Sequence, residues 1–124
     1  MKILITIAVG GAFGAVARYT LGLGVHNFLG NSFPYGTLTI NVAGSFAIGI
    51  FYAVLVESGT GLAHYRALLM IGLLGAFTTF SAFSLETIQL MEAGNISKAI
   101  ANVLLNLVLC FAACWGGLVV GRYH

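Results

Sequence analysis

The sequence predicts an all-α integral membrane protein with four transmembrane helices per chain. Hydrophobic residues make up 60% of its 124 residues and charged residues only 6%, whereas about 25% of the residues in soluble domains are charged. Four apolar stretches approach the ~20 residues that a helix needs to cross a bilayer. We expect these helices at about residues 3–23, 37–56, 67–91 and 99–120, within a single membrane domain over residues 1–124.

The first stretch has Arg18 near its end and contains no acidic residue. An arginine at this depth is most often an interfacial anchor, but it can also attract anions to a pore mouth without touching them. Small residues four apart recur along the chain, at Gly10 and Gly14, Ser45 and Gly49, and Gly117 and Gly121. Such pairs predict close helix packing, either within the chain or between subunits.

The second stretch contains Asn41 just inside its start, with Ser45 and Gly49 on the same helical face. One interpretation is a hydrogen bond between helices, worth about 1 kcal/mol. The other is that the Asn41 amide donates hydrogen bonds to an anion, because asparagine is a neutral side chain with two donors on one nitrogen.

The third stretch includes Gly72 to Glu86, which reads GLLGAFTTFSAFSLE. Gly75, Thr78 and Thr79 favour a broken helix near its middle, because glycine costs helix stability and threonine hydroxyls compete for backbone carbonyls. Broken membrane helices expose carbonyl groups that bind ions. If two breaks meet at a dimer axis, their carbonyls can hold Na⁺; the alternative is a kink closed by a hydroxyl.

Phe80 and Phe83 share a face of the same helix, and Ser81 and Ser84 form a neighbouring pair. Two such phenylalanines usually only pack. The edge of an aromatic ring nevertheless carries positive potential, so edge-on rings can attract a small anion without burying a cation.

The fourth stretch carries a stripe of polar or small side chains at i+4 spacing, comprising Asn102, Asn106, Cys110 and Cys114. This stripe either packs against another helix or provides hydrogen-bonding groups along a path. Glu86 is the only acidic residue well inside a stretch, and we interpret it as a vestibule residue, bonded to Thr37 or a stripe asparagine, or extended toward water.

The basic residues give almost no orientation signal. The side that holds the termini has Lys2, Arg66 and Arg122, whereas the other has Lys98 and, at the interface, Arg18. We therefore predict dual topology and an antiparallel homodimer with a two-fold axis in the membrane plane. A net charge of +2 is too small to indicate a nucleic-acid partner.

Three motifs, GGAFGAVARY, TINVAGSF and GLLGAFTTFSAFSLE, occur in this order over the four spans. Together they resemble the CrcB family of bacterial fluoride channels, also called Fluc. The resemblance implies passive export of cytoplasmic fluoride across the inner membrane, two pores per dimer and a structural Na⁺ at the dimer centre. Ala76 and Ala82 depart from the usual family pattern, as does the use of asparagine and cysteine in the fourth helix.

The resemblance also implies roles for individual residues. Asn41 is similar to the pore asparagine, and Phe80 and Phe83 to the pore phenylalanines. Gly75 and Thr78 resemble the backbone-carbonyl ligands of the Na⁺. The candidate fluoride path therefore comprises Thr37, Asn41, Phe80, Ser81, Phe83, Glu86 and Asn106, with Arg18 acting electrostatically at the mouth.

Three other functions compete with this interpretation. A proton-coupled exporter of the small multidrug-resistance type needs a carboxylate in its first span, and none is present here. A non-transporting assembly subunit would use its polar groups only for packing. An enzyme is not expected, because no nucleophile and base lie at workable spacing within the spans.

Overall fold

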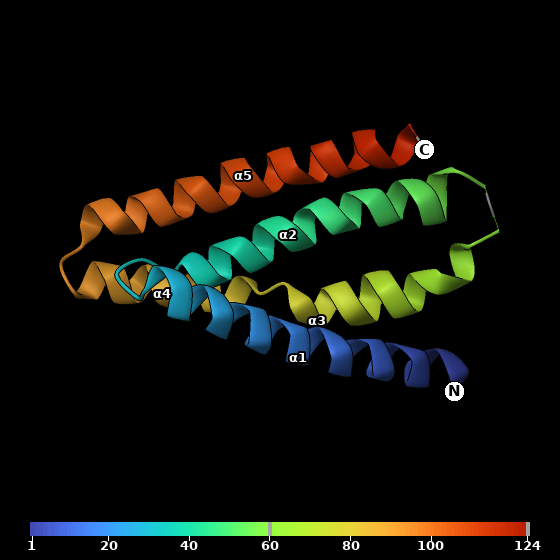
Figure 1. The fold of residues 1–124 in the computed structure, drawn as a ribbon, viewed down its shortest axis with the longest axis horizontal. Helices are drawn as coiled ribbons and strands as arrows, with labels where there is room; N and C mark the ends of the chain where they lie inside the picture. Colours follow the sequence, from blue (N-terminus) through green and yellow to red (C-terminus); the bar gives the residue numbers. More distant parts are fainter. Residues whose placement is uncertain (60, 124) are drawn as a thin grey trace.

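The computed structural model describes residues 1–59 and 61–123. Within them, four helical segments are long and apolar enough to cross a membrane, at Lys2–Leu29, Tyr35–Glu57, Ala63–Glu92 and Ile96–Arg122. These segments form an elongated bundle in which α1 begins and α5 ends at the same end (Figure 1). The chain is a multi-pass membrane protein, as its composition predicts.

The four segments differ in regularity. Two are single α-helices, α1 (Lys2–Leu29) and α5 (Ile96–Arg122). The second consists of α2 (Tyr35–Tyr52) and the π-helical η1 (Ala53–Glu57). The third contains a 3₁₀ turn η2 (Ala63–Tyr65), the π-helical η3 (Ala67–Leu74), the one-turn α3 (Gly75–Phe77) and α4 (Phe80–Glu92).

The first helix is longer than the stretch predicted at residues 3–23. It continues to Leu29 and ends where Gly30 adopts a φ of 80° and donates its N–H to the His26 carbonyl at 2.8 Å. A positive φ suits glycine and stops the helix. The length of the apolar stretch reflects the thickness of the bilayer's hydrocarbon core, whereas the end of the helix is set by Gly30.

Glycines allow the closest helix contacts inside the chain. A Cβ at Gly10 would collide with the Leu68 carbonyl oxygen of η3, and a Cβ at Gly117 would collide with the Phe46 carbonyl oxygen of α2. Gly14, Gly49 and Gly121 likewise face backbone atoms of a neighbouring helix. Of the two alternatives, the structure therefore places these five glycines at contacts within one chain.

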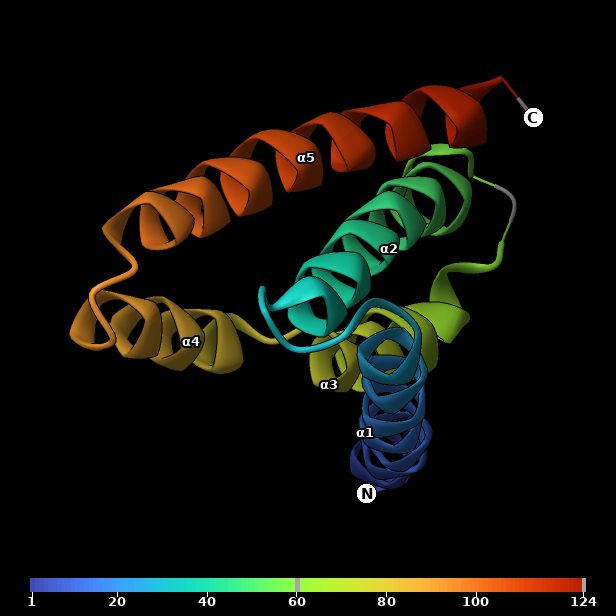
Figure 2. The same cartoon turned by 60° about the vertical axis from the view of Figure 1, so that its left-hand side comes forward.

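Helix α2 occupies the middle of the bundle and contacts both α1 and α5, as Figures 1 and 2 show. Large apolar side chains point outward from the bundle, including Phe13 (68% exposed), Trp115 (69%) and Phe111 (71%). Such a surface suits lipid or a second copy of the chain rather than water.

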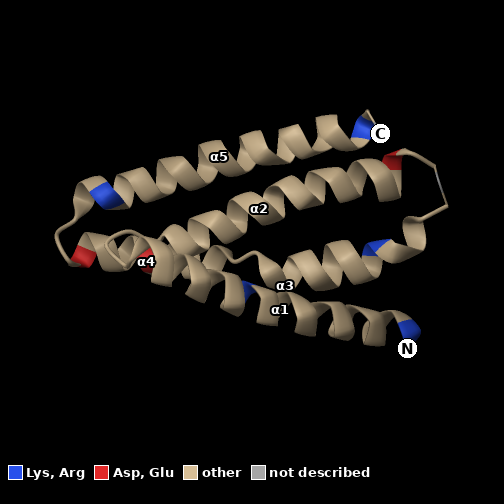
Figure 3. Ribbon diagram, in the orientation of Figure 1, with Lys and Arg blue, Asp and Glu red and all other residues tan. Residues whose placement is uncertain are grey.

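Charged residues lie mainly near the two ends of the bundle (Figure 3). At the end that holds the N-terminus, Arg122 donates to both carboxylate oxygens of Glu57, with Nε–Oε1 at 2.8 Å and Nη2–Oε2 at 3.0 Å. At the other end, Lys98 Nζ donates to the Ser32 carbonyl at 3.0 Å. These contacts join segments distant in sequence at the two ends of the apolar region.

Candidate functional site

The backbone leaves the helical conformation at Thr78 and Thr79, near the middle of the third segment. Thr78 has φ −80° and ψ 155°, and Thr79 has φ −149° and ψ 108°, both extended. The Thr78 hydroxyl donates to the Leu74 carbonyl at 3.0 Å, and the Thr79 hydroxyl accepts from the Ala82 N–H at 3.1 Å. Each threonine thereby satisfies one of the two helix ends that meet here.

Asn41 of α2 pairs with the extended backbone of Thr79 through two hydrogen bonds. The Thr79 N–H donates to Asn41 Oδ1 at 2.9 Å, and Asn41 Nδ2 donates to the Thr79 carbonyl at 3.1 Å. In a continuous helix this N–H would donate to the carbonyl of Gly75. The asparagine thus replaces a missing turn of helix, which answers the need to satisfy free backbone groups within a membrane.

A cavity of about 450 Å³ adjoins this interruption. Asn41, Gly75, Thr78, Thr79, Phe80, Phe83, Asn106 and Cys110 are among its lining residues. It brings together residues from α2, the interrupted third segment and α5. Six of the predicted site residues therefore share one cavity, including both predicted Na⁺ ligands.

A row of amide side chains extends from Asn41 toward α4. Asn41 Nδ2 lies 3.5 Å from Asn106 Oδ1, the longest hydrogen bond of the row. Asn106 Nδ2 donates to two oxygens of Asn102, the backbone carbonyl at 2.8 Å and Oδ1 at 3.0 Å. Asn102 Nδ2 then donates to the Thr87 hydroxyl at 3.0 Å, and this hydroxyl donates to the Phe83 carbonyl at 2.8 Å.

The two phenylalanines differ in environment. Their ring centroids lie 5.4 Å apart at an interplanar angle of 63°, which is an edge-to-face arrangement. Phe83 is 8% exposed, whereas Phe80 is 75% exposed. Ser81 lies outside the cavity and has its hydroxyl 3.3 Å from that of Thr79.

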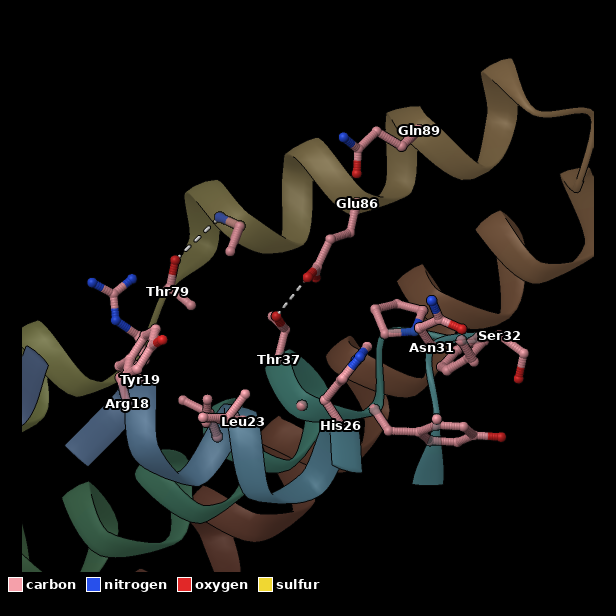
Figure 4. A pocket seen from close by; sticks show the side chains of 18 of the residues that line it. Arg18, Tyr19, Leu23, His26, Asn31, Ser32, Thr37, Thr79, Glu86 and Gln89 are labelled. Carbon is pink, nitrogen blue, oxygen red and sulfur yellow. Dashed lines mark hydrogen bonds between the residues drawn. The ribbon is translucent and has the colours of Figure 1, made fainter. Parts of the chain in front are cut away.

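A second cavity, of about 630 Å³, also has Thr79 in its lining. Arg18, Thr37, Thr79 and Glu86 line it together, and Figure 4 shows Glu86 reaching from α4 toward Thr37 at the start of α2. The Thr37 hydroxyl donates to Glu86 Oε2 at 2.9 Å. Glu86 Oε1 is buried without a hydrogen-bond partner among the described residues, and Arg18 forms no ion pair with a described residue.

The sequence alone assigns no role to Thr87, and it leaves open whether Asn102 serves for packing or for hydrogen bonding along a path. Asn102 is the most deeply buried large side chain of the described residues, at 1% exposure. Thr87 follows Phe83 by one helical turn, and that spacing was the available signal that both face the same neighbour. The pairing of α4 with α5 was needed to recognise the contact.

The fold and these cavities define a class of protein: a small helical membrane protein whose polar side chains line open cavities between its helices. Residues 5–118 match the family model described as CrcB-like protein, camphor resistance (CrcB). The chain therefore belongs to the CrcB family, and the resemblance predicted from the three motifs is confirmed.

Relatives from several bacteria are named "Fluoride-specific ion channel FluC". The relative from Magnetococcus marinus is 47% identical over 116 residues, 94% of this chain and 94% of its own length. The relative from Shewanella amazonensis is 48% identical over 117 residues, again 94% of each. The relative from Methylococcus capsulatus is 50% identical over 119 residues, 96% of this chain, which spans 52% of that relative's length.

Proposed function

We propose that this chain forms a passive, fluoride-selective channel. The observation that carries the proposal is the shared cavity, in which Asn41, Phe83 and the interrupted backbone at Thr79 meet. The relatives described above support it, because their names describe a fluoride-specific ion channel.

The chemistry of the site suits a small, strongly hydrated anion. A channel must replace the water around such an ion by hydrogen-bond donors while keeping binding weak enough for release. Asn41 supplies neutral donors, and the rings of Phe80 and Phe83 supply positively polarised edges. Ser81 adds a hydroxyl donor. Thr37 and Glu86 belong to the vestibule, where the Thr37 hydroxyl donates to Glu86, and Arg18 raises the local anion concentration at the mouth.

The functional unit in this proposal is an antiparallel, dual-topology homodimer with two pores. The exposed ring of Phe80 supports a second copy, because a single chain leaves it uncovered beside the cavity. The nearly balanced basic residues at the two ends support insertion in both orientations.

A structural Na⁺ at the dimer centre is part of the same proposal. The carbonyl groups of Gly75 and Thr78 would hold it, because both residues line the cavity where the helix is interrupted. The Thr79 N–H donates to Asn41 Oδ1 and not to the Gly75 carbonyl. This donor therefore does not compete with Na⁺ for the Gly75 carbonyl. Bound sodium would supply positive charge that joins the two chains.

In the cell, this channel would lie in the bacterial inner membrane. Hydrofluoric acid enters as a neutral molecule and dissociates inside, and the negative interior potential would then drive fluoride outward through a passive pore. Neither hydrolysis nor proton coupling is required for this flux.

Two other functions predict different chemistry. A proton-coupled exporter would need a titratable carboxylate in the first span, and α1 contains none. An assembly subunit would need no cavity lined by polar groups, whereas polar groups of three segments converge on one here.

The test is efflux from proteoliposomes loaded with potassium fluoride or potassium chloride, with valinomycin to balance charge and no pH gradient. Fluoride efflux without chloride efflux is expected. Silence for both ions would overturn the proposal and favour a coupled exporter or a structural subunit.

A further inference from the structure

Asn106 lines the cavity, and its amide nitrogen is bonded to Asn102. Both hydrogens of its nitrogen have acceptors within Asn102, at 2.8 Å to the backbone carbonyl and 3.0 Å to Oδ1. Since an asparagine amide has only two such hydrogens, Asn106 has no donor left for an anion in this arrangement. Its oxygen instead lies 3.5 Å from Asn41 Nδ2.

The direction of these bonds is fixed at the Asn102 backbone carbonyl, which can only accept and therefore takes a hydrogen from the Asn106 nitrogen. The Thr87 hydroxyl has one hydrogen, which it donates to the Phe83 carbonyl at 2.8 Å. It therefore acts as an acceptor toward Asn102, so the Asn102 nitrogen points to Thr87 and its oxygen points to Asn106. Reversing the Asn102 amide would turn its nitrogen toward the Asn106 nitrogen and bring two donors together, which is unfavourable at a residue only 1% exposed.

We propose that Asn106 acts in the empty pore as an internal acceptor for Asn41, that the permeating anion displaces it, and that Asn102 is the positioning residue that holds Asn106 in this orientation. This inference rests on the proposed fluoride channel. At 3.5 Å the Asn41–Asn106 bond is weaker than the 3.1 Å bond from Asn41 to Thr79. The anion therefore replaces the bond from Asn41 to Asn106, while the bond from Asn41 to Thr79 keeps the Asn41 side chain in place.

This role has a functional advantage. A donor left without an acceptor in a low-dielectric site is costly, so it would hold an anion tightly. An internal acceptor removes most of that cost in the empty state and weakens net binding, which favours release from the pore.

The decisive variant is Asn106→Leu, which has similar volume but no acceptor. The proposal predicts that the half-saturating fluoride concentration for initial efflux falls by about two- to fivefold, because the competing acceptor is gone. If Asn106 instead donates to fluoride, the same variant must raise that concentration, which would overturn the inference. An unchanged concentration would also overturn it.

Asn102→Leu tests the positioning step. Without the side-chain acceptor, only the backbone carbonyl of residue 102 still holds the Asn106 nitrogen, and one of its two hydrogens becomes free for an anion. The half-saturating concentration should therefore again fall. In the Asn102→Leu/Asn106→Leu double variant, the Asn102 change should have no further effect on this concentration, since no amide remains to be positioned. A purely structural role for Asn102 would lower the amount of folded channel and leave the concentration unchanged in every background.

Asn27→Leu is the matched control, because Asn27 is exposed on α1 and lines neither cavity. Fluoride efflux of the wild-type chain is the second control. No fluoride efflux from the wild type would overturn the proposed channel and this inference together, whereas normal wild-type efflux with a raised concentration in Asn106→Leu would overturn the inference alone.

Discussion

At the scale of single residues, Asn41 combines two tasks. Its side chain replaces the hydrogen bonds that the interrupted third segment loses at Thr79, and the same side chain lines the cavity. Because Asn41 Oδ1 accepts from the Thr79 N–H, the orientation of the Asn41 amide is fixed. Its nitrogen therefore donates to the Thr79 carbonyl and to Asn106 Oδ1. The same contact therefore holds the backbone and determines which atoms an anion would meet.

We expect Asn41→Asp to abolish anion flux. The substitution replaces both donors by an oxygen that faces the Thr79 carbonyl and Asn106 Oδ1, and a charged carboxylate would repel an anion in the path. Like charges in contact cost several kcal/mol, so fluoride efflux from proteoliposomes should fall at least about 100-fold. Asn27→Asp on exposed α1 is the control, and throughput near wild type in Asn41→Asp would remove Asn41 from the pore.

At the scale of elements, the start of α4 depends on one hydroxyl inside an apolar segment. Thr79 caps the helix by accepting from the Ala82 N–H at 3.1 Å. We expect Thr79→Ala to destabilise the protein by about 1 kcal/mol, the usual value of such a cap, and Thr79→Ser to restore most of it. Thermal unfolding in detergent measures the difference, and equal stability of the alanine and serine variants would refute a capping role.

The contact between α2 and α5 depends on glycine at position 117. Its absent Cβ would meet the Phe46 carbonyl oxygen, a backbone atom that cannot turn aside. We expect Gly117→Ala to destabilise the fold by about 1–3 kcal/mol, as overpacking typically does. Gly24→Ala is a matched control, since a Cβ there meets no atom within 4 Å; unfolding in detergent should distinguish the two, and similar losses in both would argue against the contact.

The sequence predicts some of these elements better than others. Apolar stretches identified the four membrane-spanning segments, because crossing a bilayer requires long apolar runs. They did not indicate the π-helical conformation of η3, since uniformly apolar residues such as Leu68 and Leu73 give no periodicity that distinguishes a π-helix from an α-helix. Spacing placed Asn102 and Asn106 on one face, but the partner Thr87 depends on which helices become neighbours.

At the scale of the whole molecule, the charges at the two ends of the bundle matter more than any single ion pair. The Glu57–Arg122 pair is partly exposed, with the Arg122 side chain 49% accessible, and pairs of this kind typically contribute about 0–1 kcal/mol. The distribution of basic residues instead bears on how the chain inserts. The proposed antiparallel dimer needs chains inserted in both orientations. The basic residues must therefore not strongly favour placing either end of the bundle in the cytoplasm.

Adding basic residues at one end of the bundle should fix the chain in one orientation, and each fixed-orientation variant should be inactive by itself. We expect Leu62→Arg/His64→Arg to fix the end with the termini in the cytoplasm, because it adds two basic residues beside Arg66, and Asn31→Arg/Asn95→Arg to fix the opposite orientation. Each variant alone lacks the inverted partner that an antiparallel dimer needs, so cells producing either one should lose fluoride efflux, and cells producing both should regain it. A reporter fused to the C-terminus measures orientation, and Leu62→Gln/His64→Gln controls for the same positions without added charge. Full efflux from one fixed-orientation variant alone would exclude the antiparallel dimer, while leaving the fluoride pore itself intact.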